Sequence, residues 1–134
     1  MRHLTTRLRI AAWDEKPIVE FDDGSKITRA SVTLSEPAGG LETGSVDSVM
    51  FYRPDGTSHY VNVMRLTGTL DGRSGSFVLS GDGDYDGTTA SGTSTLVAGS
   101  ATGDLAGISV TCTSTSTHAD YPYMPLVLTY QLTD

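Results

Sequence analysis

The densest group of side chains that could do chemistry lies near the start of the chain, at Trp13-Asp14-Glu15-Lys16-Pro17. It follows a segment that we expect to be the first strand, so its side chains can reach the mouth of a pocket. A carboxyl group beside an indole ring in a partly dry pocket can serve as a general acid or base. Glu15 is therefore a candidate acid or base, and Trp13 a candidate wall of the site. The alternative is a surface turn in which Trp13 only covers one end of the fold.

A second group lies on two neighbouring segments, 47–53 and 58–69. Side chains alternate between the two faces of a strand, so each segment should have one face that mixes polar and apolar residues. Such a mixture is typical of a pocket lining, although a packed core is an equally good interpretation. These faces hold Ser48, Met50 and Tyr52 in the first segment, and Tyr60, Asn62 and Met64 in the second.

Charged side chains on the expected strands add to the candidates. An unpaired charge inside a strand would be costly to bury, so Arg29 and Arg65 should be exposed or paired with carboxylates such as Glu15 or Asp47. As catalytic groups we consider Glu15 or Asp47 as acid or base, Arg29 or Arg65 as an orienting charge, and Tyr52 or Tyr60 as donors. The sequence alone does not decide which face of each strand points inward. The candidates to shape the cavity therefore come from both faces and are Trp13, Met50, Phe51 and Met64.

Metal and nucleophile motifs are weak. Asp82-Gly83-Asp84-Tyr85-Asp86-Gly87 begins like a calcium loop, but Thr93 stands where that loop needs a bidentate Glu. His3, His59 and His118 are far apart in the sequence, and no nucleophile elbow is present, although a Ser-His-Asp triad needs only spatial proximity. Cys112 lies in a Thr/Ser run and is interpreted as a small buried residue. We therefore expect no metal and no cofactor.

Regular turn signals predict the elements that position these residues. Asp-Gly, Gly-Gly and Pro-Asp-Gly sequences recur along the chain and supply the positive φ angles that hairpins require. Between them lie segments rich in Val, Thr, Tyr, Ile and Phe, which favour strands. We expect strands near 4–12, 26–35, 43–53, 58–69, 73–82, 85–96, 106–116 and 124–133, with a short extra piece at 17–21. Eight such strands predict one domain, 1–134, folded as a closed antiparallel β-barrel, with a two-sheet sandwich as the alternative.

Composition and charge limit the classes of partner that we expect and the compartment of the cell. The formal net charge is −7, and an acidic surface disfavours nucleic acid and anionic membranes. No apolar run approaches the roughly 20 residues that span a bilayer, and the N-terminus lacks the apolar core of a signal peptide. A single cysteine allows no internal disulfide, which fits a reducing cytoplasm. The sequence therefore predicts a cytoplasmic protein without nucleic-acid or membrane partners.

Several phrases in order resemble a bacterial family, domain of unknown function 3224. They are Trp13–Pro17, Thr28–Val32, Tyr52–Gly56, Leu66–Phe77 and Gly99–Gly107, and the resemblance covers about 10 to 133. That family is similar to the allene oxide cyclase barrel, an eight-stranded, calycin-like shape related to dirigent proteins. The resemblance implies a barrel that holds an apolar substrate and steers cyclisation, isomerisation or radical coupling, mostly by shape.

This chain departs from the family pattern at three places. Family members usually carry Glu-Tyr at Asp47-Ser48, Glu at Met64 and Gln-His at Ser80-Gly81. Loss of a Glu and a His from the lumen would leave a roomier and less polar cavity, suited to a larger hydrophobic guest. That inference requires Met64 and Gly81 to face the interior.

The sequence thus predicts a barrel that binds a hydrophobic small molecule. The leading hypothesis is a cofactor-free cyclase or isomerase that acts on a hydrophobic metabolite in natural-product biosynthesis. A non-catalytic ligand-binding or carrier protein is the alternative, and a barrel filled by its own side chains is the third. A homo-oligomer is compatible with the sequence but no exposed stripe decides it.

Overall fold

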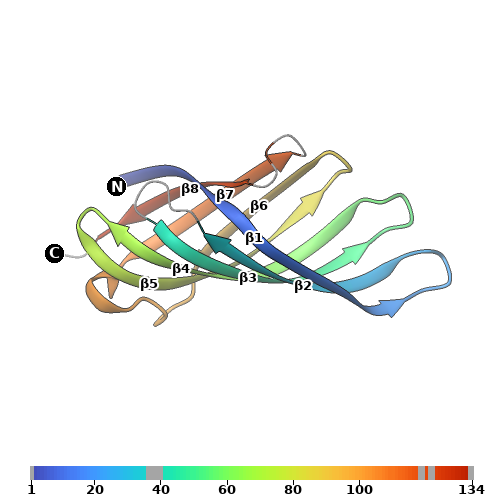
Figure 1. Ribbon diagram of the computed structural model, residues 1–134, viewed down its shortest axis with the longest axis horizontal. Coiled ribbons are helices and arrows are strands. Elements are labelled where there is room, and N and C mark those ends of the chain that lie inside the picture. Colours follow the sequence, from blue (N-terminus) through green and yellow to red (C-terminus); the bar gives the residue numbers. More distant parts are fainter. Residues whose placement is uncertain (1, 36–40, 118–119, 121–122, 133–134) are drawn as a thin grey trace.

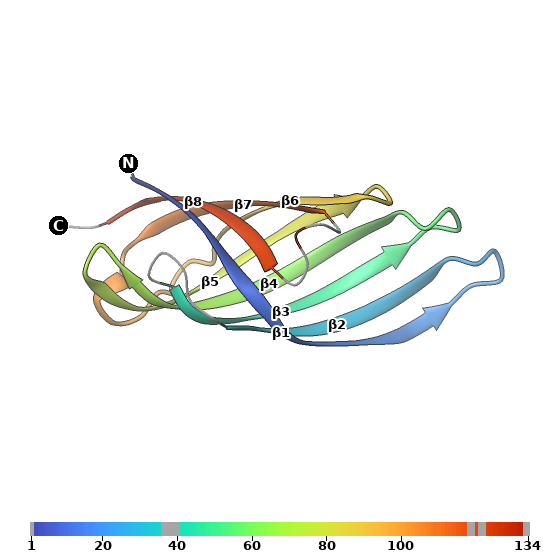
Figure 2. The same ribbon diagram turned by 45° about the horizontal axis from the view of Figure 1, so that its top comes forward.

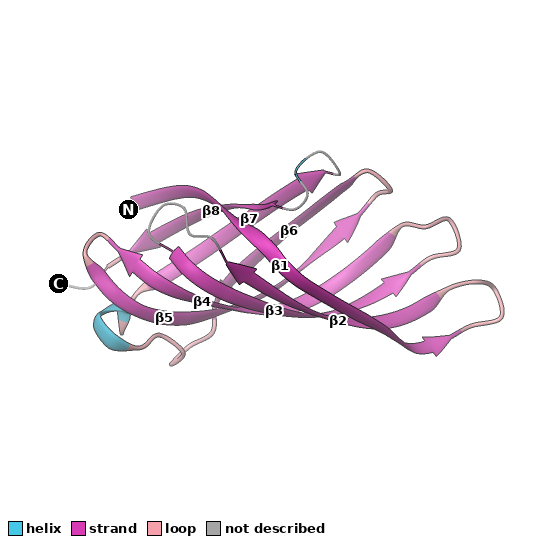
Figure 3. Cartoon of the chain, in the orientation of Figure 1, coloured by secondary structure: helices cyan, strands magenta, loops and turns pink. Residues whose placement is uncertain are grey.

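Eight β-strands make up most of the computed structural model, which describes residues 2–35, 41–117, 120 and 123–132. Figure 1 labels the strands, and Figure 3 shows how little helix there is. The strands are β1 (Arg2–Glu20), β2 (Lys26–Ser35), β3 (Leu41–Tyr52), β4 (Ser58–Leu70), β5 (Arg73–Tyr85), β6 (Thr89–Leu96), β7 (Ser109–Thr117) and β8 (Tyr123–Gln131). A single 3-10 turn, η1 (Gly103–Leu105), precedes β7.

The strands form one antiparallel sheet that closes on itself. Each strand pairs with the next in the chain, and β1 also pairs with β8. This ring confirms the all-β, eight-stranded antiparallel prediction, and it excludes the alternative of two separate sheets. Closure also removes the free edges that long hairpins would otherwise expose.

The predicted turns supply the required backbone angles. Gly24, Gly56, Gly72 and Gly87 have φ values of 93°, 89°, 80° and 104°. At the β4–β5 turn the preceding Asp71 is also left-handed, with φ of 50°, as a two-residue hairpin with Asp-Gly requires. The predicted turn at Gly39-Gly40 and the histidine at 118 lie outside the described residues.

The structure corrects three predicted boundaries. The separate piece at 17–21 does not exist, because β1 continues through it with register shifts between Ile10 and Ala12 and between Pro17 and Val19. These bulges let one strand absorb a proline and a charged cluster without losing its pairing to β2. The seventh strand starts at Ser109 rather than 106, because η1 and its following turn occupy the preceding residues. Residue 85 ends β5 and does not begin β6, which starts at Thr89 after the Asp86-Gly87 turn.

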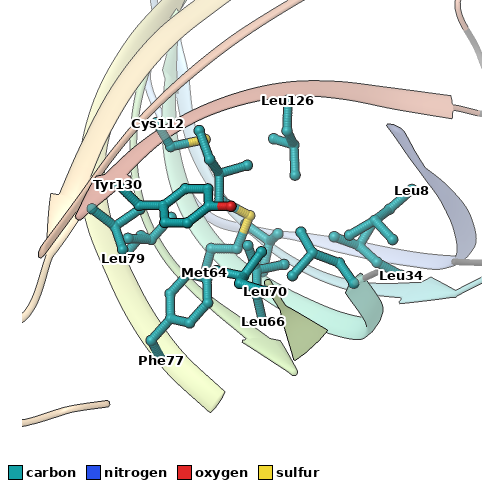
Figure 4. Packing of buried hydrophobic residues seen from close by; sticks show 14 of the residues in the cluster. Leu8, Leu34, Met64, Leu66, Leu70, Phe77, Leu79, Cys112, Leu126 and Tyr130 are labelled. Atoms are coloured by element: carbon teal, nitrogen blue, oxygen red, sulfur yellow. The ribbon is translucent and has the colours of Figure 1, made fainter. Parts of the chain in front are cut away.

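The two ends of the ring differ. The turns β1–β2, β3–β4 and β5–β6 extend together at one end, here called the open end, and the β4–β5 turn and η1 lie at the other, the closed end (Figure 2). Large apolar side chains from many strands meet inside the ring (Figure 4). Those at 1% exposure or less include Leu8, Leu34, Leu41, Leu66, Leu70, Phe77, Leu79, Leu126 and Leu128. Their burial supplies most of the hydrophobic stabilisation and fixes which half of the lumen is filled.

Candidate functional site

A cavity of about 440 Å³ occupies the lumen beyond this leucine-rich core. Its residues come from every strand of the ring and are mainly apolar or hydroxyl-bearing. They include Ile10, Trp13, Val32, Val46, Ser48, Met50, Tyr52, Tyr60, Asn62, Met64, Ser94, Cys112, Ser114, Met124 and Leu126. A volume of this size lies within the roughly 300–1,000 Å³ of small-molecule sites. The cavity rules out the interpretation in which side chains fill the whole ring.

The faces of β3 and β4 point as strand alternation predicts. Met50 and Met64 are 6% and 5% exposed and lie along the cavity wall with Tyr60. Gly81 of β5 sits opposite Asn62 of β4, on the same inward face. Met64 and Gly81 therefore face the interior, as the hypothesis of a less polar lumen requires.

Glu15 anchors a hydrogen-bonded cluster at the rim of the cavity. The shift after Ile10 brings Trp13 opposite Val32 and Glu15 opposite Ala30, both inward-facing positions of β2. Trp13 Nε1 donates to Glu15 Oε1 at 3.0 Å. Thr28 Oγ1 and the Tyr52 hydroxyl both donate to Glu15 Oε2 at 2.9 Å.

This cluster fixes what its members can do. Burial, the hydrogen bond to Glu15 and the charge of that carboxylate together raise the pKa of Tyr52 to about 12. Tyr52 is thus a neutral donor at physiological pH, and its proton is already directed at Glu15. With three donors on its oxygens, Glu15 organises the rim and is only partly available to accept a proton from a ligand.

Three polar side chains on one wall have no partner among the described residues. Ser48 and Asn62 are directly opposite across β3 and β4, and Tyr60 is the next inward-facing residue before Asn62. Within the described ranges, these three side chains make no hydrogen bond. No polar side-chain atom there is both fully buried and unpaired, so the polar atoms of these three residues are accessible. Their polar atoms therefore reach the cavity space and can serve a ligand.

Tyr60 lies against backbone that only glycine permits. A Cβ at Gly83 would collide with the Tyr60 hydroxyl, and one at Gly92 would lie 2.9 Å from it. Burial, followed by the negative charges of Asp84 and Asp82, raises the pKa of Tyr60. This hydroxyl is a neutral donor or acceptor at the β5–β6 side of the cavity.

Cys112 also lines the cavity but is poorly suited to be a nucleophile. It is 2% exposed, and burial raises the pKa of its thiol to about 11 although a hydrogen bond to Ser94 opposes the shift. Thiolate is the reactive form, so this group is nearly inert at neutral pH. The prediction of a small buried residue is confirmed.

Four predicted site residues lie on the outer face of the sheet. Arg29 Nη2 is 3.3 Å from Asp47 Oδ1, and both side chains are exposed. Phe51 is 40% exposed on the same outer face, and Arg65 Nη2 donates to Ser76 Oγ at 3.4 Å.

The prediction that these four residues take part in a site inside the lumen is wrong. Each of them alternates with the inward-facing residues of its strand, so its side chain points outward. The structure brings together Glu15, Tyr52 and Trp13 at the rim and Met50, Tyr60 and Met64 on the wall. Sequence reasoning placed Ser48 and Asn62 on the right face but did not select them, and a polar residue inside an apolar alternating face was the available signal.

The described residues hold no group of three or more His, Cys, Asp or Glu side chains that could hold a metal ion. The acidic sequence that resembles a calcium loop is used locally. His59 Nδ1 lies 2.9 Å from Asp84 Oδ1, and Asp86 Oδ1 accepts the backbone N–H groups of Thr88 and Thr89. In the part of the chain that is described, no helix is long and apolar enough to cross a membrane.

A family model described as "Protein of unknown function (DUF3224)" matches residues 4–125. The chain belongs to the DUF3224 family. A crystal structure of a DUF3224 protein of unknown function from Shewanella oneidensis MR-1 is similar to it, with a TM-score of 0.74 and 19% identity. The alignment covers 100% of this chain and 99% of that one, and at this identity it supports the fold alone. No curated protein matches the chain.

Proposed function

We propose that this DUF3224 protein binds a hydrophobic small molecule in its lumen. The observation that supports this most is the cavity of about 440 Å³, walled by Val32, Val46, Met50, Met64 and Leu126. An apolar ligand that enters it removes its own surface and that of the wall from water, which favours binding. The closed end is filled by leucines, so the ligand enters from the open end, past the rim cluster of Trp13, Glu15 and Tyr52.

A cofactor-free cyclase or isomerase is the second candidate. It rests on the resemblance to allene oxide cyclase barrels that the sequence suggests, and on Tyr60 and Asn62, whose side chains make no hydrogen bond within the described ranges of the chain. These groups could bond a carbonyl oxygen of the ligand and stabilise negative charge that develops on it. The apolar wall would hold the ligand in one folded conformation, which is how a shape-templated cyclisation gains its rate.

A cavity-filling variant tests ligand binding. We expect Met64→Trp to abolish the fluorescence enhancement of a neutral apolar probe, N-phenyl-1-naphthylamine, which the wild-type protein should bind. Val127→Trp is the matched control, because Val127 is 41% exposed on the outer face of β8. Equal probe binding by both variants would contradict a luminal site.

Mass spectrometry separates the carrier from the enzyme. Small molecules are extracted from purified protein, identified, and incubated again with ligand-free protein. Recovery of the same compound unchanged supports a carrier, whereas conversion to an isomer of equal mass supports the cyclase or isomerase. If nothing is retained and the probe does not bind, both proposals fail.

A further inference from the structure

Two of the neutral polar groups that face the ligand lie together. Ser48 and Asn62 occupy opposed positions on β3 and β4, whereas the Tyr60 hydroxyl reaches across to Gly83 and Gly92 on β5 and β6. The Ser48 hydroxyl and the Asn62 amide can each donate to, or accept from, a carbonyl or hydroxyl oxygen of a ligand. By contrast, the hydroxyl of Ser114 on the far strands already donates to the Pro125 carbonyl at 2.8 Å. Ser48 and Asn62 thus place two unused polar groups side by side on the β3–β4 wall.

Charge in and around the cavity disfavours an anionic guest. Among the described residues that line it there is no lysine or arginine, and the carboxylate of Asp82, which borders it, points to the outer face, with Oδ2 3.7 Å from His59 Nε2. Glu15 lies at the rim, and the cation nearest to it among these contacts is Lys26, whose Nζ is 5.2 Å from the centre of the Tyr52 ring. The negative charges of Asp84 and Asp82 also act on Tyr60, since they raise its pKa after burial. A carboxylate ligand placed on this wall would be desolvated without a counter-ion, which is costly.

We propose that the natural ligand is an uncharged apolar molecule with a carbonyl or hydroxyl oxygen that bonds to Ser48 and Asn62 on the β3–β4 wall. This inference rests on the proposed function and narrows it, because fatty acids and other carboxylates are disfavoured. The leucine core ends the cavity at one side, so the apolar body of the ligand points to the closed end and its oxygen lies midway along the wall.

Matched displacement measurements test this proposal. Bound N-phenyl-1-naphthylamine is displaced at pH 8 by 2-undecanone, 1-undecanol and undecanoate, which share one chain length and differ in the polar group. We expect the ketone or the alcohol to displace the probe at a concentration at least tenfold below that of the carboxylate. Displacement by undecanoate at an equal or lower concentration would overturn the proposal while leaving the luminal site intact. Failure of the probe to bind at all would instead overturn the proposed function.

Variants locate the polar contact. Asn62→Leu keeps the volume and removes the amide, so we expect the advantage of the ketone over the carboxylate to fall at least several-fold. Thr111→Val is the control, because Thr111 is exposed on the outer face of β7 and does not line the cavity. An unchanged advantage in Asn62→Leu would show that the wall does not recognise the oxygen.

The outer face of β2–β5 carries an independent feature, a row of four exposed residues at one register level. Arg29, Val49, Val61 and Asp82 are successive partners across the four strands. Val49 and Val61 in the middle of the row are 41% and 50% exposed. Arg29 at one end lies 3.3 Å from Asp47, and Asp82 at the other end lies 3.7 Å from His59. Contiguous exposed apolar residues on a soluble sheet mark an interaction surface.

The order of charges in this row identifies the partner. A two-fold axis parallel to the strands, between β3 and β4, would place a second copy of the row in reversed order over the first. Arg29 of each copy would then face Asp82 of the other, and Val49 would face Val61. Face-to-face sheets keep their strand directions within about 30°, which this axis satisfies. We infer that two copies of this chain associate through this face as an isologous dimer.

Charge exchange tests the dimer. We expect wild-type protein to sediment as a dimer, Arg29→Asp to shift to monomer, and the double variant Arg29→Asp with Asp82→Arg to return to dimer. Recovery in the double variant is not expected from a change of folding alone. A monomeric wild type, or a double variant that stays monomeric, would overturn the inference.

Discussion

Tyr52 shows how one hydroxyl couples the rim of the cavity to the stability of the ring. Its hydroxyl donates to Glu15, and its pKa is raised from the ordinary 10.0 to about 12. A pKa that is higher in the folded than in the unfolded state stabilises the fold below pH 10, and this stabilisation is lost as the pH rises from about 10 to 12. The folded state therefore favours the neutral form of the Tyr52 hydroxyl.

Tyr52→Phe should destabilise the protein by about 1 kcal/mol at pH 7, because one partly buried hydrogen bond is lost. We also expect the difference between variant and wild type to shrink between pH 10 and 12. Urea denaturation at several pH values measures both effects. Tyr85→Phe is the control, since its hydroxyl bonds to the exposed Gly87 carbonyl. A difference that stays constant to pH 12 would contradict the role of the neutral phenol.

Cys112 permits a chemical check on the buried wall. The rise of its pKa from 9.0 to about 11 lowers the thiolate fraction at pH 8 by about 100-fold. We therefore expect an aqueous disulfide reagent to label native protein at least 100-fold more slowly than protein unfolded in guanidinium. Equal rates would mean that the thiol is open to solvent.

Residue chemistry was predictable where alternation alone decided it. Strand alternation places Met50 on one face of β3, and Tyr60 and Met64 on one face of β4. The mixture of polar and apolar residues on these faces favoured a pocket lining. Asp47 and Phe51 could not be placed, since the outer face of β3 carries Val49 and Phe51 and is as apolar as the inner one. Orientation here depends on ring closure, which no local pattern encodes.

At the scale of elements, β5 and β6 approach each other at Gly81. A Cβ there would collide with the Thr93 carbonyl and lie 2.6 Å from Ser94 Cα. Backbone rather than flexible side chain would have to move. The close approach also brings Ser94 to the cavity wall beside Cys112.

Gly81→Ala should therefore destabilise the protein by about 1–3 kcal/mol through overpacking. Ser80→Ala is the matched control, because its side chain lies one step away on the opposite face of β5. Thermal and urea denaturation of both variants measure the difference. Equal stability of the two variants would show that β6 can shift outward without cost.

Element boundaries were predictable at the hairpins and less so elsewhere. Asp23-Gly24 and Asp71-Gly72 mark turns, in which Gly24, Asp71 and Gly72 have positive φ angles. The continuity of β1 through Pro17 could not be foreseen, since a bulge depends on what β2 offers in register. The delayed start of β7 likewise depends on η1, whose backbone packs against β5 through Thr102 and Ser76.

At the scale of the whole molecule, one residue links the strands that close the ring. Asp71 lies in the β4–β5 turn, and its Oδ2 accepts the Tyr130 hydroxyl of β8 at 2.6 Å. Arg2 Nη1 of β1 lies 2.8 Å from the same oxygen. The carboxylate thus joins the β1–β8 seam to the turn at the closed end, while the cavity lies toward the open end.

The contacts of Asp71 with Tyr130 and Arg2 should make the stability of the ring depend on pH in the acidic range. The hydrogen bonds from Tyr130 and Arg2 hold the pKa of Asp71 below its ordinary 3.8. A carboxyl group whose pKa is lower in the folded state stabilises the fold above the unfolded value, and the contribution is lost as the pH falls through the folded pKa. Asp71→Asn should therefore lower the urea midpoint at pH 7 and match wild type more closely at pH 2.5.

Comparison of wild type with Asp71→Asn separates the contribution of these contacts from that of the aspartates in other turns. Asp23, Asp55 and Asp86 also have lowered pKa values, from hydrogen bonds within their own turns, so wild-type protein should weaken in acid for several reasons. Only the difference between wild type and Asp71→Asn reports on the seam, and Asp104→Asn in η1 serves as the control. A difference as large at pH 2.5 as at pH 7 would mean that Asp71 acts through its turn geometry, with φ of 50°, and not through its charge.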